Sequence, residues 1–176
     1  MTEEPNTPHF HWYKEALEEN SLRLDETFVR YGCGRPGVVK QIVEELLAGD
    51  SRLPQAFLCT GDHIAFAVCD ALREQGYRVP DDVIVTGFGG IPEAQHFSPR
   101  LTTCNSNPSG LARKCLACID SVWQGGSTPG EEINYYTVDY TESCGCQSMN
   151  TSDMHATICR QYSMADEQAA HEDVMF

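Results

Sequence analysis

The hydrophobic and polar positions of this chain follow a pattern that predicts an α/β domain. Two short apolar runs, residues 56–59 and 83–86, have the length and composition of buried strands. Between them Ala65, Cys69 and Leu72 recur at helical spacing. A strand, a helix and a second strand over about thirty residues form a βαβ unit, in which the two strands run parallel.

The same alternation continues on both sides of this unit. Apolar periodicity predicts further helices over residues 12–20, 38–48 and 109–124, and further strands over residues 28–31, 101–104 and 134–140. Elements that alternate in this way pack in layers around a mainly parallel sheet. We therefore expect a three-layer α/β sandwich over residues 9–146, with a disordered N-terminus over residues 1–8 and a connector or tail over residues 147–176.

Charge and hydropathy exclude two classes of partner. The chain has 26 acidic and 12 basic residues, a formal net charge of -14. This balance argues against direct contact with nucleic acid, because phosphate contacts require clustered Lys and Arg. No apolar run approaches the roughly 18 residues of a membrane span, and the acidic start does not have the character of a signal peptide. We expect a cytoplasmic protein.

The nine cysteines indicate reduced thiols rather than a disulfide framework, because their number is odd and several lie inside apolar runs. Cys115 and Cys118 fall within a predicted helix without a second pair at zinc-finger spacing, which favours packing over metal binding. A redox or metal role for Cys144 and Cys146 stays open. We expect no metal, no cofactor and no catalytic residue.

Glycine follows each strand of the βαβ unit. Gly61 comes after the first strand, and residues 87–90 read Gly-Phe-Gly-Gly at the end of the second. Ligands of open parallel sheets bind just beyond the carboxyl ends of the strands. The two glycine loops are therefore the first place to look for a binding site.

A series of motifs makes the chain resemble the effector-binding core of the LacI/GalR transcriptional repressors, which have the type I periplasmic-binding-protein fold. The motifs are Thr60-Gly61-Asp62, Ile64-Ala65, residues 76–82, residues 83–90 and residues 99–103. The ending Ser143-Cys144-Gly145-Cys146 is especially similar to LacI-like sensor modules of signalling proteins such as diguanylate cyclases. The resemblance implies that this chain contains mainly the C-terminal lobe of the core and lacks the DNA-binding helix-turn-helix.

The resemblance also implies where an effector would bind. The positions that contact ligand in the family, or lie beside such contacts, correspond to His9, Tyr13, Gly34, Gly61, Asp62, His63, Gly89 and Gly90. For two of these the local sequence favours a second interpretation, in which Asp62 caps the following helix and His63 faces solvent. Glycine or histidine stands where the family has Arg, Asn and Asp. Either the ligand is not a sugar or the lobe has lost sensing, and the glycine backbone could instead receive an anion.

The helix after Gly61 is apolar nearly all round, which indicates burial on two sides. The resemblance implies a homodimer surface in this region, with Ile64, Phe66, Ala67 and Ala71 as its residues. Two hypotheses for function follow. The first is a non-catalytic sensor of a small-molecule effector in a bacterial transcription regulator or signalling protein. The alternative is a degenerate lobe that serves as a dimerisation or structural module without ligand.

Overall fold

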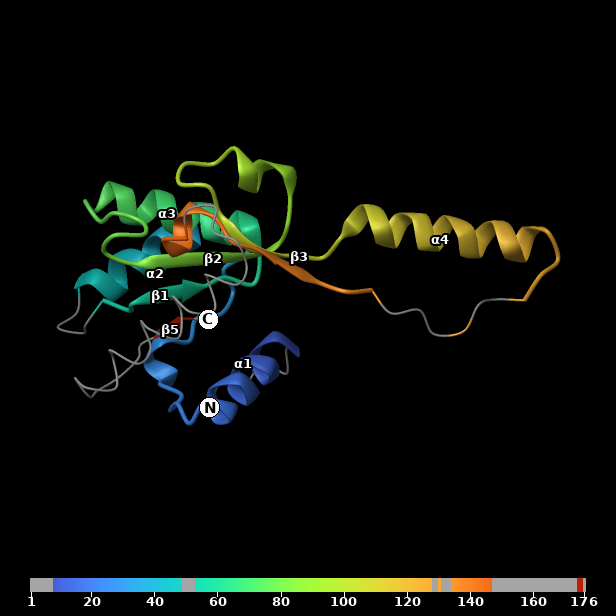
Figure 1. The fold of residues 1–176 in the computed structure, drawn as a ribbon. Helices are drawn as coiled ribbons and strands as arrows, with labels where there is room; N and C mark the ends of the chain where they lie inside the picture. The colour runs from blue at the N-terminus through green and yellow to red at the C-terminus, as the bar shows by residue number, and fades with distance from the viewer. Residues whose placement is uncertain (1–7, 49–52, 128–129, 131–133, 147–173, 176) are drawn as a thin grey trace.

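The computed structural model describes residues 8–48, 53–127, 130, 134–146 and 174–175. Its elements, drawn in Figure 1, are α1 (Pro8–Glu19), η1 (Glu26–Phe28), α2 (Pro36–Ala48), β1 (Ala56–Leu58), α3 (Asp62–Glu74), β2 (Ile84–Gly89), η2 (Pro92–Gln95), β3 (Thr102–Asn105), α4 (Pro108–Trp123), β4 (Thr137–Asp139), η3 (Glu142–Cys144) and β5 (Val174–Met175). The predicted tail over residues 147–176 lies outside the described residues except for β5, and so does the predicted disordered N-terminus except for Pro8.

The strands form one mixed sheet in the order β4-β3-β2-β1-β5. The pairs β1–β2, β2–β3 and β1–β5 are parallel, and β4 runs antiparallel to β3. Phe57 pairs with Val85, and Thr86 pairs with Thr102. The expected α/β fold with a mainly parallel sheet is confirmed.

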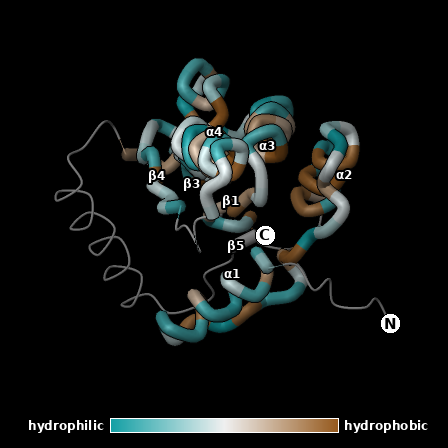
Figure 2. The backbone as a smooth tube through the Cα atoms, turned by 90° about the vertical axis from the view of Figure 1, so that its right-hand side faces the viewer, coloured by the Kyte–Doolittle hydropathy of each residue, from teal (hydrophilic) through white to brown (hydrophobic). Residues whose placement is uncertain are grey.

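Helices lie on both sides of this sheet. α3 packs against β2 and β1 and is flanked by α2, whereas α1 lies on the other side of the sheet (Figures 1 and 2). The main core joins α2 and α3 to the sheet through Val43, Phe57, Leu72 and Val85. α1 belongs to a second, separate cluster, formed by Phe10, Tyr13, Leu17 and Val29. The domain therefore has two apolar cores, and the cavity described below lies between the elements that form them.

The prediction of a strand over residues 28–31 is wrong. Residues 26–28 form η1, whose start is fixed by the Asp25 carboxylate accepting a hydrogen bond from the Thr27 amide at 2.9 Å. Phe28 then enters the main core, while Val29 enters the α1 cluster. The two consecutive side chains do point in opposite directions, as in a strand. They pack into two different apolar cores, however, and not against the two faces of one sheet.

α3 has apolar residues on two sides because this chain itself covers both. α2 packs along one side, and on another the rings of Phe66 and Phe97 stack with centroids 4.4 Å apart. Ala71 is buried and Ile64 packs against the main core. The apolar character of α3 is therefore accounted for within the domain, and Ala71 is not available to a partner chain. A dimer surface at Phe66 and Ala67 stays a prediction.

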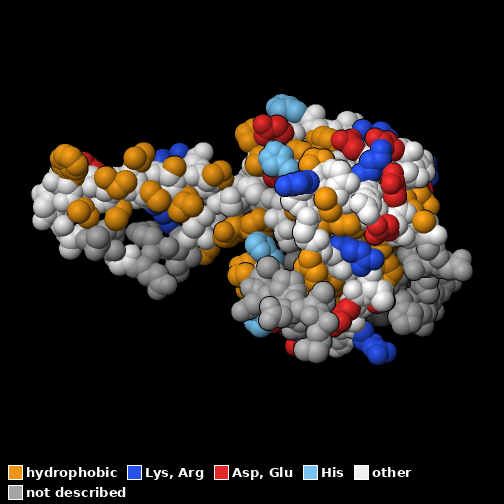
Figure 3. Space-filling model, turned by 180° about the vertical axis from the view of Figure 1, so that it is seen from behind, with side chains coloured by type: hydrophobic (Ala, Val, Ile, Leu, Met, Phe, Trp, Pro, Cys, Tyr) orange, Lys and Arg blue, Asp and Glu red, His pale blue; other side chains and the backbone are white. Residues whose placement is uncertain are grey.

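α4 projects away from the rest of the domain (Figure 1). It begins after Asn107, whose side chain accepts a hydrogen bond from the Gly110 amide at 3.1 Å and so replaces the expected cap at Ser109. None of its residues is buried. Figure 3 shows hydrophobic side chains along the projecting helix, and the large exposed ones are Leu111, Leu116, Ile119, Val122 and Trp123.

Candidate functional site

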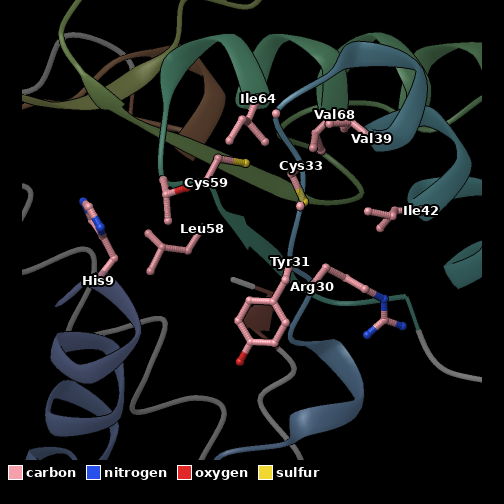
Figure 4. A pocket seen from close by; sticks show the side chains of 13 residues that line it. His9, Arg30, Tyr31, Cys33, Val39, Ile42, Leu58, Cys59, Ile64 and Val68 are labelled. Atoms are coloured by element: carbon pink, nitrogen blue, oxygen red, sulfur yellow. The ribbon is translucent and has the colours of Figure 1, made fainter. Parts of the chain in front are cut away.

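A cavity of about 260 Å³ lies at the carboxyl end of β1. Its walls come from α1, the loop over residues 30–34, α2, the end of β1 and α3 (Figure 4). The lining residues are His9, Arg30, Tyr31, Gly32, Cys33, Gly34, Val39, Ile42, Leu58, Cys59, Thr60, Ile64 and Val68. Most of these side chains are apolar. The place is the one expected for a ligand of an open parallel sheet, and the lining is typical of small-molecule sites.

A row of aromatic rings starts at the wall of the cavity. The His9 ring lies 5.5 Å from the Trp12 ring and 5.2 Å from the Phe88 ring, and Phe88 lies 5.6 Å from Tyr136. These residues come from α1, from β2 and from the segment before β4. Trp12 and Tyr136 are each 55% exposed. Of this row only His9 lines the cavity, and its flat ring provides a surface on which a planar ligand can stack.

The polar groups of the cavity are few. Arg30 donates hydrogen bonds to the backbone carbonyls of Thr27 and Val29, so its guanidinium is held by the loop that carries it. Burial raises the pKa of the Cys33 thiol, although Arg30 opposes the effect, and burial also raises the pKa of the Cys59 thiol. Both thiols are therefore protonated at neutral pH and act as apolar surface rather than as nucleophiles.

Asp62 has a structural role that neither sequence interpretation included. Its side chain is only 2% exposed, and its carboxylate accepts hydrogen bonds from the Thr103 hydroxyl at 2.5 Å and the Ile91 amide at 2.9 Å. Gly61 occupies the cap position of α3 without a side-chain hydrogen bond. Asp62 thus ties the start of α3 to β3 and to the loop after β2, and it does not line the cavity.

Close packing requires glycine in the second half of β2, which contains Gly87 and Gly89, and at Gly90 directly after it. A Cβ at Gly87 would lie 2.8 Å from Leu101 Cδ2 and 3.2 Å from Asp62 Cα. Gly90 has φ +72°, and a Cβ there would lie 2.8 Å from Asn105 Cα. At Gly34, by contrast, a Cβ would meet no atom within 4 Å. Gly89, the last residue of β2, has φ +131°, and a Cβ there would lie 3.3 Å from Asp62 Oδ2. Gly89 and Gly90 are therefore packed, whereas Gly34 borders open space.

The structure brings together only part of the predicted site. His9 and Gly34 line the cavity, and Gly61 directly follows the lining residue Thr60. Tyr13 lies in the α1 cluster, where burial, with a smaller contribution from Asp25, raises its pKa to about 12. His63 is exposed, with its ring 6.0 Å from Phe66. Tyr13 therefore packs in the α1 cluster and His63 faces solvent, and neither lines the cavity.

Sequence reasoning did not find the apolar wall of the site, which includes Leu58, Ile42 and Val68. Leu58 carried a usable signal in its position, because it lies near the end of a short apolar run that leads into the Gly61 loop. Ile42 and Val68 look like ordinary core positions of amphipathic helices. Among the described residues no group of three or more His, Cys, Asp or Glu side chains could hold a metal ion. None of the described helices is both long and apolar enough to cross a membrane.

Comparison with known sequences gives consistent matches. The family model of the periplasmic binding protein-like domain matches residues 2–144. The transcriptional repressor PurR of Histophilus somni is 30% identical over 120 residues, which are 68% of this chain and 35% of that protein. PurR of Yersinia enterocolitica is 33% identical over 107 residues, 61% of this chain and 31% of that protein. The chain spans about a third of the length of these curated relatives.

Solved structures agree on the fold. The Escherichia coli transcriptional repressor ascG has a TM-score of 0.71 at 24% identity, over 80% of this chain and 52% of that chain. The transcriptional regulator CelR, solved as a cellobiose complex, has a TM-score of 0.63 at 28% identity, over 76% of this chain and 41% of that chain. The lac repressor dimer bound to operator has a TM-score of 0.62 at 18% identity, over 76% of this chain and 46% of that chain. The chain belongs to the family of periplasmic binding protein-like domains, and its relatives are LacI-type transcription regulators.

Proposed function

We propose that this chain is a non-catalytic, ligand-sensing lobe of a cytoplasmic LacI-type transcription regulator, and that the cavity beside His9 receives its effector. The observation that carries the proposal is the cavity itself, an apolar hollow at the carboxyl end of β1 with the rings of His9 and Tyr31 in its wall. The family membership and the PurR relatives support a regulatory role.

The lining favours an effector with a flat, largely apolar ring. A sugar presents hydroxyl groups all round, and each hydroxyl buried without a partner costs about 1–3 kcal/mol. Few polar side chains face this cavity, and Nη1 of the Arg30 guanidinium is engaged by two backbone carbonyls. A ring stacked on His9 or Tyr31, which line the cavity, would instead gain aromatic contacts of about 0.5–1.5 kcal/mol each.

The position of the cavity provides a mechanism for sensing. His9 lies on α1, whose apolar residues form their own cluster, whereas Val39, Cys59 and Val68 belong to the main core. A ligand that contacts both walls would join two separately packed parts of the domain. Binding would then favour the arrangement in which these walls lie close together, which is how a ligand shifts a conformational equilibrium.

Replacing His9 with alanine tests this site, and His11→Ala is the matched control. His9 lines the cavity, whereas His11, two residues along the same helix, is exposed and lies 3.4 Å from Glu15. A panel of ring-bearing metabolites is first tested for thermal stabilisation of the wild-type chain. For any compound that binds, calorimetry should show about tenfold weaker affinity in His9→Ala, about 1.4 kcal/mol, and unchanged affinity in His11→Ala.

Two results would reject the sensing proposal. In one, no compound of the panel raises the melting temperature of the wild-type chain. In the other, a compound binds, but a bulky replacement at the cavity, Leu58→Trp, leaves its affinity unchanged. Leu58 lies at the end of β1 and lines the cavity, so a larger side chain there would occupy the space assigned to the ligand.

A second candidate function is assembly without a small-molecule ligand. It is favoured by the α4 face, where five large apolar side chains are exposed and none of the helix residues is buried. Monomeric proteins rarely expose a large contiguous apolar patch. The partner that we propose for this face is a second copy of the chain, and the relative solved as the lac repressor is described as a dimer.

A further inference from the structure

A second cluster of polar and thiol side chains lies at the amino ends of the strands, opposite the carboxyl ends where the cavity lies. β4 leads the chain to η3 (Glu142–Cys144), beside the amino ends of β2 and β3. The Ser143 hydroxyl accepts a hydrogen bond from the Thr102 amide at 2.8 Å and donates one to the Val85 carbonyl at 2.6 Å. The Glu142 carboxylate accepts hydrogen bonds from Arg100. This turn is therefore fixed to two strands of the core.

The thiols of Cys144 and Cys146 lie on either side of Gly145, the residue that caps this turn. Gly145 has φ +78°, and its amide donates to the Glu142 carbonyl at 2.9 Å. The Cys144 thiol contacts the Thr141 carbonyl at 3.3 Å, and the Cys146 thiol contacts the Cys144 carbonyl at 3.9 Å. The left-handed glycine thus turns the side chain of Cys146 back toward the residue with which it could pair. Cys144 is partly exposed, whereas Cys146 is buried.

We propose that Cys144 and Cys146 form a redox-active dithiol that a low-molecular-weight disulfide such as glutathione disulfide oxidises to an intramolecular disulfide. The Cys144 thiolate attacks one sulfur of the oxidant, forms a mixed disulfide and releases one thiol. Cys146 then loses its proton to water and attacks the sulfur of Cys144, which releases the second thiol. Two protein thiols and one small disulfide are converted into one protein disulfide and two small thiols.

The environments of the two thiols assign their order of reaction. Cys144 is the one that an oxidant can reach from solvent. Burial, together with the neighbouring Cys144, raises the pKa of the Cys146 thiol to about 12. Because the thiolate is the attacking form, Cys146 acts in the slower second step. A mixed disulfide on Cys144 is therefore the expected intermediate.

Other thiols of the described chain differ from this pair. Cys59 and Cys69 are buried in the main core and have raised pKa values, because burial disfavours the thiolate. Cys115 and Cys118 lie one turn apart on the uncovered helix α4, where Cys115 is exposed and not packed as the sequence suggested. The α4 pair is the competing dithiol, so it is removed in the test.

Oxidation of Cys144 and Cys146 would change the conformation of the turn formed by η3 and Gly145. A disulfide between residues separated by one position closes a small, strained ring, and strained disulfides are the easily reduced, regulatory ones. Ring formation would move the Cys144 sulfur away from the Thr141 carbonyl. The change occurs next to Ser143, which fastens this turn to β2 and β3, and directly before residue 147.

The test uses the full chain with Cys115→Ser and Cys118→Ser, first reduced and then equilibrated in glutathione buffers of increasing oxidised fraction. Free thiols are alkylated, and mass spectrometry examines the peptide that contains residues 144–146. We expect this peptide to lose the mass of two hydrogen atoms and to escape alkylation. Adding Cys146→Ser should trap glutathione on Cys144, because the thiol that resolves the mixed disulfide is absent. Adding Cys144→Ser should leave Cys146 reduced.

Three outcomes would overturn the proposal. The first is that both cysteines remain open to alkylation at every buffer ratio. The second is that glutathione accumulates on Cys144 without conversion to an intramolecular disulfide. The third is that the same amount of protein disulfide forms in the Cys144→Ser variant, which would assign oxidation to other cysteines. Circular dichroism of each serine variant confirms that it is folded before the comparison is made.

Discussion

Replacing Asp62 with alanine is expected to lower the free energy of unfolding by about 3–5 kcal/mol. The substitution removes a buried carboxylate and leaves the Thr103 hydroxyl and the Ile91 amide without their acceptor. A hydrogen bond to a charged group contributes about 1.5–3 kcal/mol, and each buried polar group left unpaired adds a desolvation cost. A domain of this size has only about 5–15 kcal/mol of stability in total. Urea unfolding followed by circular dichroism measures the loss.

Asp70→Ala is the matched control, because it removes an exposed carboxylate from the same helix. Asp70 pairs with Arg73 at 2.9 Å near the surface, where such pairs contribute about 0–1 kcal/mol. If Asp62→Ala is no more destabilising than Asp70→Ala, Asp62 does not hold α3 to β3 as the geometry indicates. Asp62→Asn is expected to lie between the two, since an amide retains one acceptor oxygen.

Gly87→Ala examines the same contact from the opposite side. The added Cβ would lie 2.8 Å from Leu101 Cδ2 and would also press on the Asp62 carboxylate. Overpacking of this kind costs about 1–3 kcal/mol. In the Asp62→Ala background part of the crowding is relieved, so the cost of Gly87→Ala should be smaller there. Strict additivity in this double-mutant cycle would contradict direct packing between the two residues.

The order of helices and strands could be predicted because it follows from the local spacing of apolar residues. The predicted helix over residues 38–48 corresponds to α2, and the strand over residues 101–104 to β3, each within two residues. The error at residues 28–31 has a physical cause. The sequence pattern shows that adjacent side chains point in opposite directions, but it does not show which parts of the protein they pack against. The pairing of β5 with β1 joins residues more than a hundred positions apart, and no local pattern reports such a contact.

The site could be predicted less well than the fold, for a related reason. His9 and Gly34, which the family resemblance gave as ligand positions, line the cavity, and their contact with a ligand stays a prediction. The resemblance could not show that the Asp62 carboxylate accepts a hydrogen bond from Thr103, 41 positions later, because that contact depends on how α3 packs on the sheet. Gly89 and Gly90, at the end of β2, looked like lost ligand contacts, yet Gly90 is required where its backbone closely approaches Asn105. Residue type alone does not separate a packed glycine from an open one.

The double substitution Leu116→Ser and Ile119→Ser is expected to abolish self-association of the chain. Leu116 is 66% and Ile119 60% exposed, on a helix that extends away from the domain (Figure 3). Burying a Leu or Ile side chain contributes about 1.5–3 kcal/mol, and a symmetric dimer would bury each of them twice. Losing four such contacts should raise the dimer dissociation constant at least about a hundredfold.

Sedimentation equilibrium over a range of concentrations measures the effect, with Arg113→Ser on the same helix as the control. The wild type and the control should approach twice the chain mass of 19.6 kDa, and the double variant should remain a monomer. Its melting temperature as a monomer should not change, because neither side chain belongs to a core cluster. A wild type that is monomeric at every concentration would contradict the proposal that a second copy of the chain covers the α4 face. A double variant that still dimerises would move the interface to the surface of α3 around Phe66 and Ala67.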